Sequence, residues 1–288
     1  MIFELSILFA FGAMLCWGIG DFLIQRTVRK VGDVETLAFI GIIGGVLLLP
    51  FIIYEKSTIF TIQNLLLLLV LGVITFVVAL FNFEALKRGK LAVVDVILEL
   101  ELPVTIILSY VFFKEKLSGI QFFIIAFIFI GLILMALKTF KKDFWKGFEK
   151  GLLLAVITAL GMGLVNFFTA VSSKNISPFM AIWLPWIIFT IFCFIVIIRR
   201  GELKKFSGNF MKFKTLIIFM GIFDTLAWLF YALAVVQNDV AVTTAITESY
   251  PAIALFLGLW LNKERIKKHQ YIGAGLALIA SVALAFLI

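Results

Sequence analysis

Long apolar runs, separated by short polar segments, follow one another along the whole chain. Most are close to 20 residues long, the length that an α-helix needs to cross the hydrocarbon core of a bilayer. The pattern predicts an all-α integral membrane protein, and the short connections predict that neighbouring spans are antiparallel. Ten transmembrane helices are expected, at residues 5–25, 35–54, 62–83, 91–113, 119–138, 151–172, 178–198, 214–236, 240–261 and 270–288.

Composition supports this prediction and narrows the class of protein. Hydrophobic residues make up 63% of the chain, and the mean hydropathy of +1.17 excludes a soluble domain. Cys16 and Cys193 both fall inside apolar spans, where they are expected to pack and to form no disulfide or metal site. The first four residues carry no positive charge, so residues 5–25 are interpreted as a first helix and not as a cleaved signal. We expect a multi-pass protein of the cell membrane without cofactors.

The net charge of +8 is carried by the short loops. Of the 25 lysine and arginine residues, the loops after even-numbered spans hold only Lys56, Lys114, Lys116 and Lys174. The positive-inside rule therefore places the other loops in the cytoplasm and both termini outside. This distribution indicates membrane orientation and argues against nucleic acid as a partner.

One apolar stretch, residues 91–117, contains the acidic residues Asp95, Glu99 and Glu101 followed by Pro103. A carboxylate at the centre of a bilayer costs about 2.5–3.5 kcal/mol, so these groups should be protonated, paired or facing a polar cavity. If the stretch is one helix, Asp95 and Glu99 share a face and Glu101 points to roughly the opposite side, unless Pro103 kinks the helix.

This stretch has a counterpart 149 residues later, at 240–266, where Glu248 occupies the position of Glu99. The apolar run that starts the second half repeats the first span in the same way, since Gly163 and Asn166 follow Gly18 and Asp21 by 145 residues. Two copies of five spans are therefore expected, and an odd number of spans per copy makes the copies inverted. The predicted units are a first repeat at 1–138, an interfacial connector at 139–150 and a second repeat at 151–288.

The order of these motifs resembles the drug/metabolite transporter superfamily, in its EamA-type ten-helix branch. The resemblance covers both halves of the chain and is carried by Trp17-Gly18, by the helices with Pro103 and Pro251, and by the Lys-Glu turns that follow them. It implies inverted five-helix repeats around a central cavity, alternating access and transport of a small molecule, with no enzymatic activity.

Apart from Lys138 and Lys214 at span ends, the expected spans hold no lysine or arginine but several acidic residues, and the single histidine, His269, falls in a loop. An acidic cavity without a fixed cation can hold protons or bind a cationic substrate, and an exchange of one for the other is proton-coupled antiport. Phosphorylated substrates would require arginine or lysine in the cavity. The acidic residues of the spans are Asp21, Glu84, Asp95, Glu99, Glu101, Asp224 and Glu248.

The acidic cavity suggests one group of residues for proton coupling and another for substrate binding. Glu99 and Glu248 are expected to couple transport to protons, because they are the acidic pair that repeats between the halves. Each candidate also has a structural alternative: threonines can bond their own helix backbone, the acids can bond other helices, and Glu84 can reach the interface. For Glu101 a structural role and a functional role are equally expected. The expected substrate-binding residues are Asp21, Asp95, Asn166, Asp224, Trp228, Tyr231 and Thr244.

The leading functional hypothesis is a secondary transporter that exports a small amine, amino acid or organic cation in exchange for protons. Its partners would be the substrate, protons and the lipid bilayer, and the protein would be a monomer or a homodimer. A second hypothesis is an intramembrane aspartyl protease, because Gly18-Ile19-Gly20-Asp21 matches the short G-x-G-D motif. A channel or lipid flippase is the third.

Overall fold

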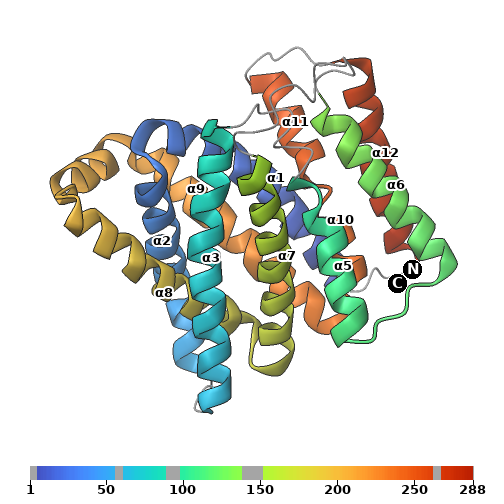
Figure 1. Cartoon of the computed structure of the whole chain (residues 1–288), viewed down its shortest axis with the longest axis horizontal. Coiled ribbons are helices and arrows are strands. Elements are labelled where there is room, and N and C mark those ends of the chain that lie inside the picture. Colours follow the sequence, from blue (N-terminus) through green and yellow to red (C-terminus); the bar gives the residue numbers. More distant parts are fainter. Residues whose placement is uncertain (1–4, 56–60, 89–97, 138–151, 262–266, 288) are drawn as a thin grey trace.

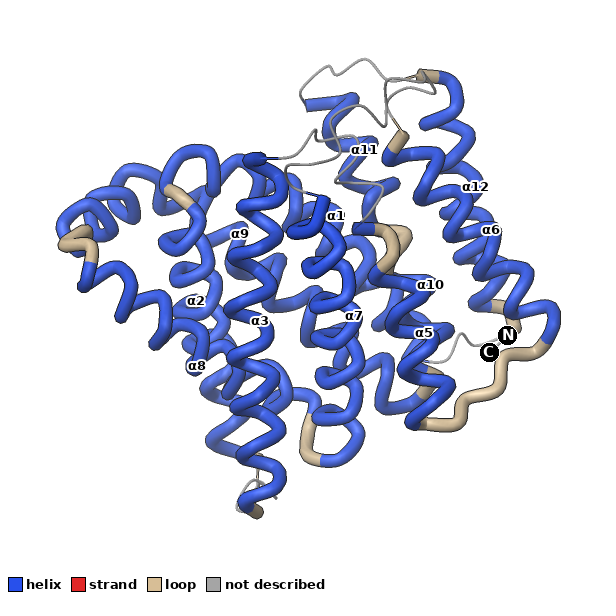
Figure 2. Tube along the Cα trace, viewed as in Figure 1, coloured by secondary structure: helices blue, strands red, loops and turns tan. Residues whose placement is uncertain are grey.

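The computed structural model describes residues 5–55, 61–88, 98–137, 152–261 and 267–287, which form helices and no strand. Figures 1 and 2 show how these helices are arranged. Their bounds are α1 Leu5–Val31, α2 Asp33–Tyr54, α3 Ile62–Arg88, α5 Glu101–Phe112, α6 Gly119–Ala136, α7 Leu152–Asn175, α8 Pro178–Arg199, α9 Leu203–Gln237, α10 Val240–Thr247, α11 Tyr250–Leu261 and α12 Lys268–Ala285.

Eight stretches of the described residues are long and apolar enough to cross a membrane, and α10 with α11 counts as one of them. The sequence predicts ten. The two that fall short are α5, an apolar helix of 12 residues, and α12, whose first turn contains the polar residues Lys268, His269 and Gln270. The all-α membrane fold is confirmed, and the count of ten remains a prediction.

Helix packing repeats between the two halves of the chain. Helix α1 packs against α9 and α11, and α7, its counterpart in the second half, packs against α3 and α5. Helices α2 and α8 pack against each other, as do α6 and α12, which lie side by side at one end of the molecule in Figure 1. Exchanging the halves therefore returns the same set of helix pairs.

The acidic stretch of each half is interrupted at the equivalent place. Residues Glu99 and Leu100 form a turn before α5, and Glu248 and Ser249 form a turn between α10 and α11. The expectation of one continuous helix through residues 91–117 is therefore wrong. Each break lies just before a proline, because proline lacks an amide proton and its ring clashes with the carbonyl one turn earlier.

The connection predicted at residues 199–213 is also different from the expectation. Helix α9 begins at Leu203, and Phe213 has non-helical dihedral angles (φ −122°, ψ 22°), so a short helix joins the predicted span at a kink. The connector predicted at 139–150 lies outside the described residues.

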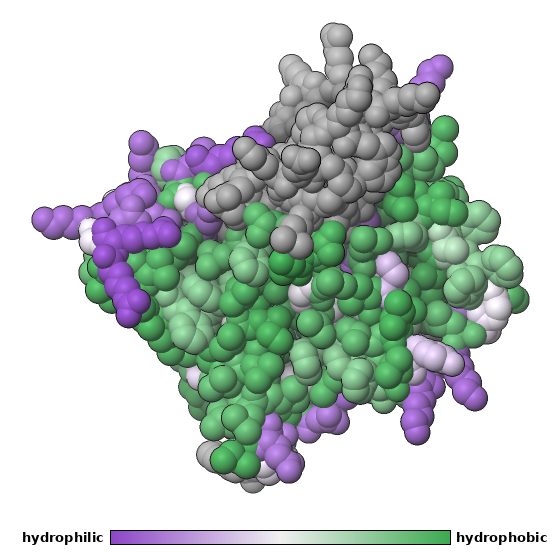
Figure 3. All heavy atoms as spheres, viewed as in Figure 1, coloured by the Kyte–Doolittle hydropathy of each residue, from purple (hydrophilic) through white to green (hydrophobic). Residues whose placement is uncertain are grey.

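Apolar side chains cover most of the face shown in Figure 3, and hydrophilic residues gather at its margins. Large hydrophobic residues such as Val46 (69% exposed) and Trp260 (78% exposed) point away from the protein. Exposed apolar surface of this extent is stable only in contact with lipid. The fold is that of a multi-pass membrane protein.

Candidate functional site

A cavity of about 200 Å³ lies among α1, α3, α7, α8 and α9, beside the two helix breaks. The residues that line it include four acids, Asp21, Glu101, Asp224 and Glu248. No lysine, arginine or histidine is among the lining residues in the described part of the chain. The described lining of the cavity therefore offers carboxyl groups to a ligand and no fixed positive charge to balance them.

Glu101 and Glu248 meet at a single amide. Asn166 on α7 donates a hydrogen bond from Nδ2 to Glu101 Oε1 (2.8 Å) and another to Glu248 Oε1 (3.2 Å). Glu101 is the first residue of α5, and Glu248 caps the end of α10. The helix breaks thus bring one carboxyl group from each half to the same nitrogen.

A second pair of acids lies on α1 and α9. These helices are in contact here, since a Cβ at Gly20 would lie 3.6 Å from the backbone nitrogen of Asp224. Asp21 is close enough to Asp224 for their charges to interact, and Tyr250 supplies Asp21 with a side-chain hydrogen bond.

Aromatic rings form the wall next to this pair. Trp17 and Trp228 are in edge-to-face contact, with ring centroids 5.0 Å apart and planes at 90°, and Trp186 contacts Trp228 at 6.3 Å. All three rings line the cavity. Aromatic faces attract cations, so this wall complements the carboxyl groups beside it.

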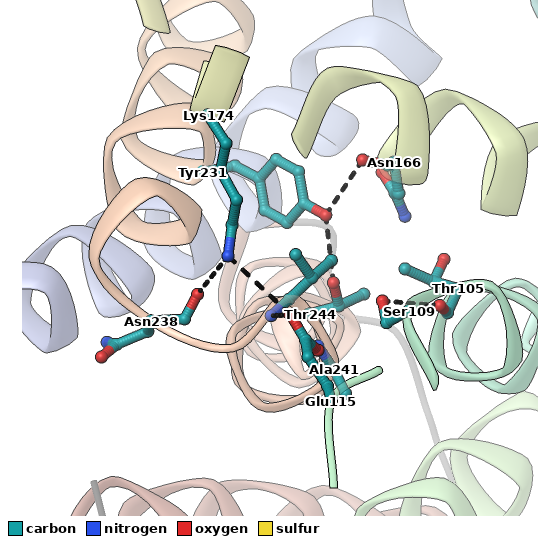
Figure 4. A network of polar contacts seen from close by, with 10 residues as sticks. Thr105, Ser109, Glu115, Asn166, Lys174, Tyr231, Asn238, Ala241 and Thr244 are labelled. Atoms are coloured by element: carbon teal, nitrogen blue, oxygen red, sulfur yellow. Dashed lines mark hydrogen bonds and ion pairs between the residues drawn. The ribbon is translucent and has the colours of Figure 1, made fainter. Parts of the chain in front are cut away.

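Tyr231 and Thr244 lie behind the cavity wall. Tyr231 is fully buried, and its hydroxyl group lies 3.0 Å from Thr244 Oγ1 and 3.3 Å from the backbone oxygen of Asn166 (Figure 4). Neither residue is among those that line the cavity. Their hydrogen bonds connect α9 to α10 and to the backbone of Asn166, and their predicted contact with the substrate stays a prediction.

The same network continues to the start of α10. Glu115, in the segment after α5, accepts hydrogen bonds from the backbone nitrogens of Val240 (2.8 Å) and Ala241 (3.0 Å). Lys174 lies 3.8 Å from Glu115 Oε1 and donates to the backbone oxygen of Asn238, as Figure 4 shows. Burial raises the pKa of the Glu115 carboxyl group, although the two backbone amides and Lys174 oppose that shift.

Most residues that the sequence singles out for binding lie at this cavity. Trp228 and the polar residues Asp21, Asn166, Asp224 and Glu248 line it. Tyr231 and Thr244 lie behind its wall. Asp95 lies outside the described residues, as does the side chain of Glu84.

The pairing of acids differs from the expectation. Glu101, and not Glu99, shares the Asn166 amide with Glu248, whereas Glu99 is half-buried in the turn and is not among the residues that line the cavity. The prediction that Glu101 points away assumed an unbroken helix, and the turn before α5 removes that assumption. The repeat could have indicated that Glu101 faces the cavity, because its counterpart 149 residues later, Tyr250, also lines the cavity.

Comparisons with known proteins agree with this architecture. The model of the EamA-like transporter family matches residues 4–137 and again residues 149–286. An uncharacterized protein of Methanocaldococcus jannaschii is 28% identical over 122 residues, which are 42% of this chain and 88% of that protein.

A solved crystal structure of another protein superposes with a TM-score of 0.75 at 15% identity, covering 99% of both chains, and shows the likeness of fold alone. The family transports solutes and is not enzymatic, so the G-x-G-D match at residues 18–21 does not mark a protease. With its family model matched twice along nearly the whole length, the chain belongs to the EamA-like transporter family and is a multi-pass membrane transporter.

Proposed function

We propose that the protein is a secondary active transporter that exchanges a small organic cation, such as an amine or a cationic amino acid, for protons. The observation that carries this proposal is the set of four carboxyl groups around one cavity whose described lining residues include no basic side chain. A site of this composition favours a cation or bound protons, and it disfavours phosphorylated substrates, which require arginine or lysine.

Glu101 and Glu248 are the proposed proton-binding pair. Two carboxyl groups that share one amide donor repel each other when both are ionised, so such a pair retains a proton in the absence of a cation. A cation that enters the cavity stabilises the ionised form of both carboxyl groups, so the proton dissociates. Release of the proton on binding then couples the two fluxes.

Asp21 and Asp224 are the proposed contacts for the substrate cation. They line the same cavity as Trp17 and Trp228, whose rings stabilise a positive charge that has lost its water. The proposal thus divides the acids of the cavity into a proton pair and a cation pair.

Alternating access is proposed to use the repeated helix pairs. Two copies in inverted orientation, related by an axis in the membrane plane, would open the cavity to either side in turn as the equivalent pairs exchange their packing. A proton gradient directed into the cell would drive the cation outward, so export is the proposed direction.

Uptake into proteoliposomes under an imposed pH gradient tests this proposal. A panel of radiolabelled small amines is offered to the wild type and to the variants Glu101→Gln, Glu248→Gln and Glu99→Gln. We expect gradient-driven uptake to fall to background in the first two variants, while counterflow exchange partly survives because an amide resembles a protonated acid.

Glu99→Gln is the comparison variant, because Glu99 is near enough to Glu248 for their charges to interact but lies in the adjacent turn and is not among the residues that line the cavity. It should retain most of the gradient-driven uptake. Loss of uptake in Glu99→Gln together with normal uptake in Glu101→Gln would restore the pairing expected from the sequence and contradict the one proposed here.

A further inference from the structure

The cavity contains a second polar region that the proposed proton and cation pairs leave unused. Asn82 on α3 and Thr158 on α7 both line the cavity. Their side-chain oxygens, Asn82 Oδ1 and Thr158 Oγ1, are buried and have no hydrogen-bond partner in the part of the chain that the structure describes. A buried polar atom without a partner destabilises the site, so a ligand that bonds these oxygens gains affinity.

These two residues lie at one level of the cavity. Helices α3 and α7 run in opposite directions side by side (Figure 1), and they cross where Gly161 meets Val78. Asn82 is one turn beyond Val78 and Thr158 is almost one turn before Gly161. Because the helices are antiparallel, both displacements lead toward the same end of the cavity.

The carboxyl groups lie at the other end. Thr158 and Asn166 are eight residues apart on α7, which is a rise of about 12 Å along the helix. Asn166 Oδ1 is also buried and without a partner among the described residues, and it belongs to the amide that bridges Glu101 and Glu248. Between the two polar regions the wall of α7 is apolar, formed by Met162 and Val165.

We propose that the substrate is a linear aliphatic diamine, bound with one ammonium group among the carboxyl groups and the other at Asn82 and Thr158. This inference rests on the proposed function and specifies the substrate class of the same cavity. Each ammonium group has three donors, which suits oxygens that lack partners, and the methylene chain suits the apolar wall between them. If the rise of about 12 Å between Thr158 and Asn166 is taken as the separation of the two regions, hydrogen bonds of about 2.9 Å at both ends leave about 6 Å between the nitrogens, the span of a chain of four to five carbons.

Binding to purified protein in detergent tests the inference, with thermal stabilisation and calorimetry as readouts. The probes are 1,4-diaminobutane, 1,5-diaminopentane, n-butylamine and 4-amino-1-butanol, with 1,2-diaminoethane and 1,8-diaminooctane as length controls. We expect the four- and five-carbon diamines to bind at least ~10-fold more tightly than n-butylamine, as one hydrogen-bonded charged group predicts. The shorter and longer diamines should lose this advantage.

The variant Thr158→Val removes one unpartnered oxygen without changing the shape of the side chain. It should reduce diamine affinity to near that of n-butylamine and leave n-butylamine binding unchanged. The control is Thr225→Val, since Thr225 Oγ1 is also buried without a partner among the described residues but is not among those that line the cavity. It should change neither affinity.

The outcomes separate this inference from the proposed function. Equal binding of n-butylamine and the diamines, in the wild type, would overturn the second ammonium site and leave the cation site standing. Diamine selectivity that is unaffected by Thr158→Val, or an equal loss of both ligands in that variant, would also overturn it. Failure of every amine to bind would contradict the proposed function as well.

Discussion

Two helix crossings, α1 with α11 and α7 with α5, have the same backbone geometry but different polar side chains. At the first, a Cβ on Gly18 would lie 2.5 Å from Ile253 Cβ and 3.0 Å from the backbone oxygen of Tyr250. At the second, a Cβ on Gly163 would lie 2.7 Å from Val104 Cβ and 3.2 Å from the backbone oxygen of Glu101.

One turn after each glycine the chemistry diverges. Asp21 follows Gly18 and receives a hydrogen bond from Tyr250, whereas Asn166 follows Gly163 and donates to Glu101. The acid and its neutral partner have thus changed places between the halves. The comparison teaches that duplication preserved the close helix approach while the polar partners specialised, with the bridging amide present in the second half only.

Loss of the bridging amide, which distinguishes the two crossings, should reduce stability the most. Asn166→Leu removes the two hydrogen bonds that the amide donates to Glu101 and Glu248, which costs about 3 kcal/mol for two bonds to acidic groups in a buried site. The free energy of unfolding in detergent measures this cost. Asn166→Asp, which makes the second crossing resemble the first, should destabilise the protein more at neutral pH than at acidic pH; an unchanged stability would contradict the bridge.

Adding a methyl group at either crossing should reduce stability somewhat less, and the two losses should be similar. Gly18→Ala and Gly163→Ala each force a methyl group against backbone and a β-branched side chain, and such overpacking costs about 1–3 kcal/mol. Gly275→Ala on α12 is the control, because no atom lies within 4 Å of the added group. A tolerated Gly163→Ala beside a damaging Gly18→Ala would show that the crossings are not equivalent.

Removal of the carboxylate that caps α10 should cost about 1 kcal/mol, the usual value for a lost helix cap. Glu115→Gln retains one acceptor for Val240 or Ala241 and loses the other. Burial raises the folded-state pKa of Glu115 above its ordinary value of 4.5, so the folded protein holds this proton more tightly than the unfolded chain does. Such a group contributes stability at low pH that is lost as the pH rises through the folded pKa.

The stability advantage of the wild type over Glu115→Gln should therefore shrink as the pH rises above about 4.5. Parallel melting curves of the two proteins across pH measure this difference directly, because the other acids cancel. An advantage that grows with pH would mean that the backbone amides and Lys174 outweigh burial at this carboxyl group.

The smallest loss of stability is expected from a substitution at Tyr231, behind the cavity wall. Tyr231→Phe removes the hydroxyl group that bonds Thr244 and the backbone oxygen of Asn166, at a cost of about 0.5–1.5 kcal/mol. Since Tyr231 does not line the cavity, ligand affinity should change less than twofold. Calorimetric titration of an amine ligand checks this, and a tenfold loss would place Tyr231 in contact with the substrate.

The sequence predicted the all-α membrane fold from long hydrophobic runs and the two repeats from paired motifs. Asp21, Asn166, Asp224, Trp228 and Glu248 were expected at the cavity and line it in the structure. The role of each residue in transport stays a prediction.

The partner of Glu248 could not be predicted from periodicity. The assumption of a regular helix through residues 91–117 turned Glu101 away from Glu99, although Pro103 marked the turn that breaks it. Asn82 and Thr158 were not predicted either, because an isolated polar residue in an apolar span gives no sign that its oxygen lacks a partner.

The central claim is that the Glu101–Asn166–Glu248 cluster releases a proton when a cation binds. Calorimetry of amine binding in buffers of different ionisation enthalpy counts the protons released. For the wild type at neutral pH we predict close to one proton per bound cation, and for the Glu101→Gln, Glu248→Gln double variant we predict none. Undiminished proton release in the double variant would contradict the claim and move the proton site to Asp21 and Asp224.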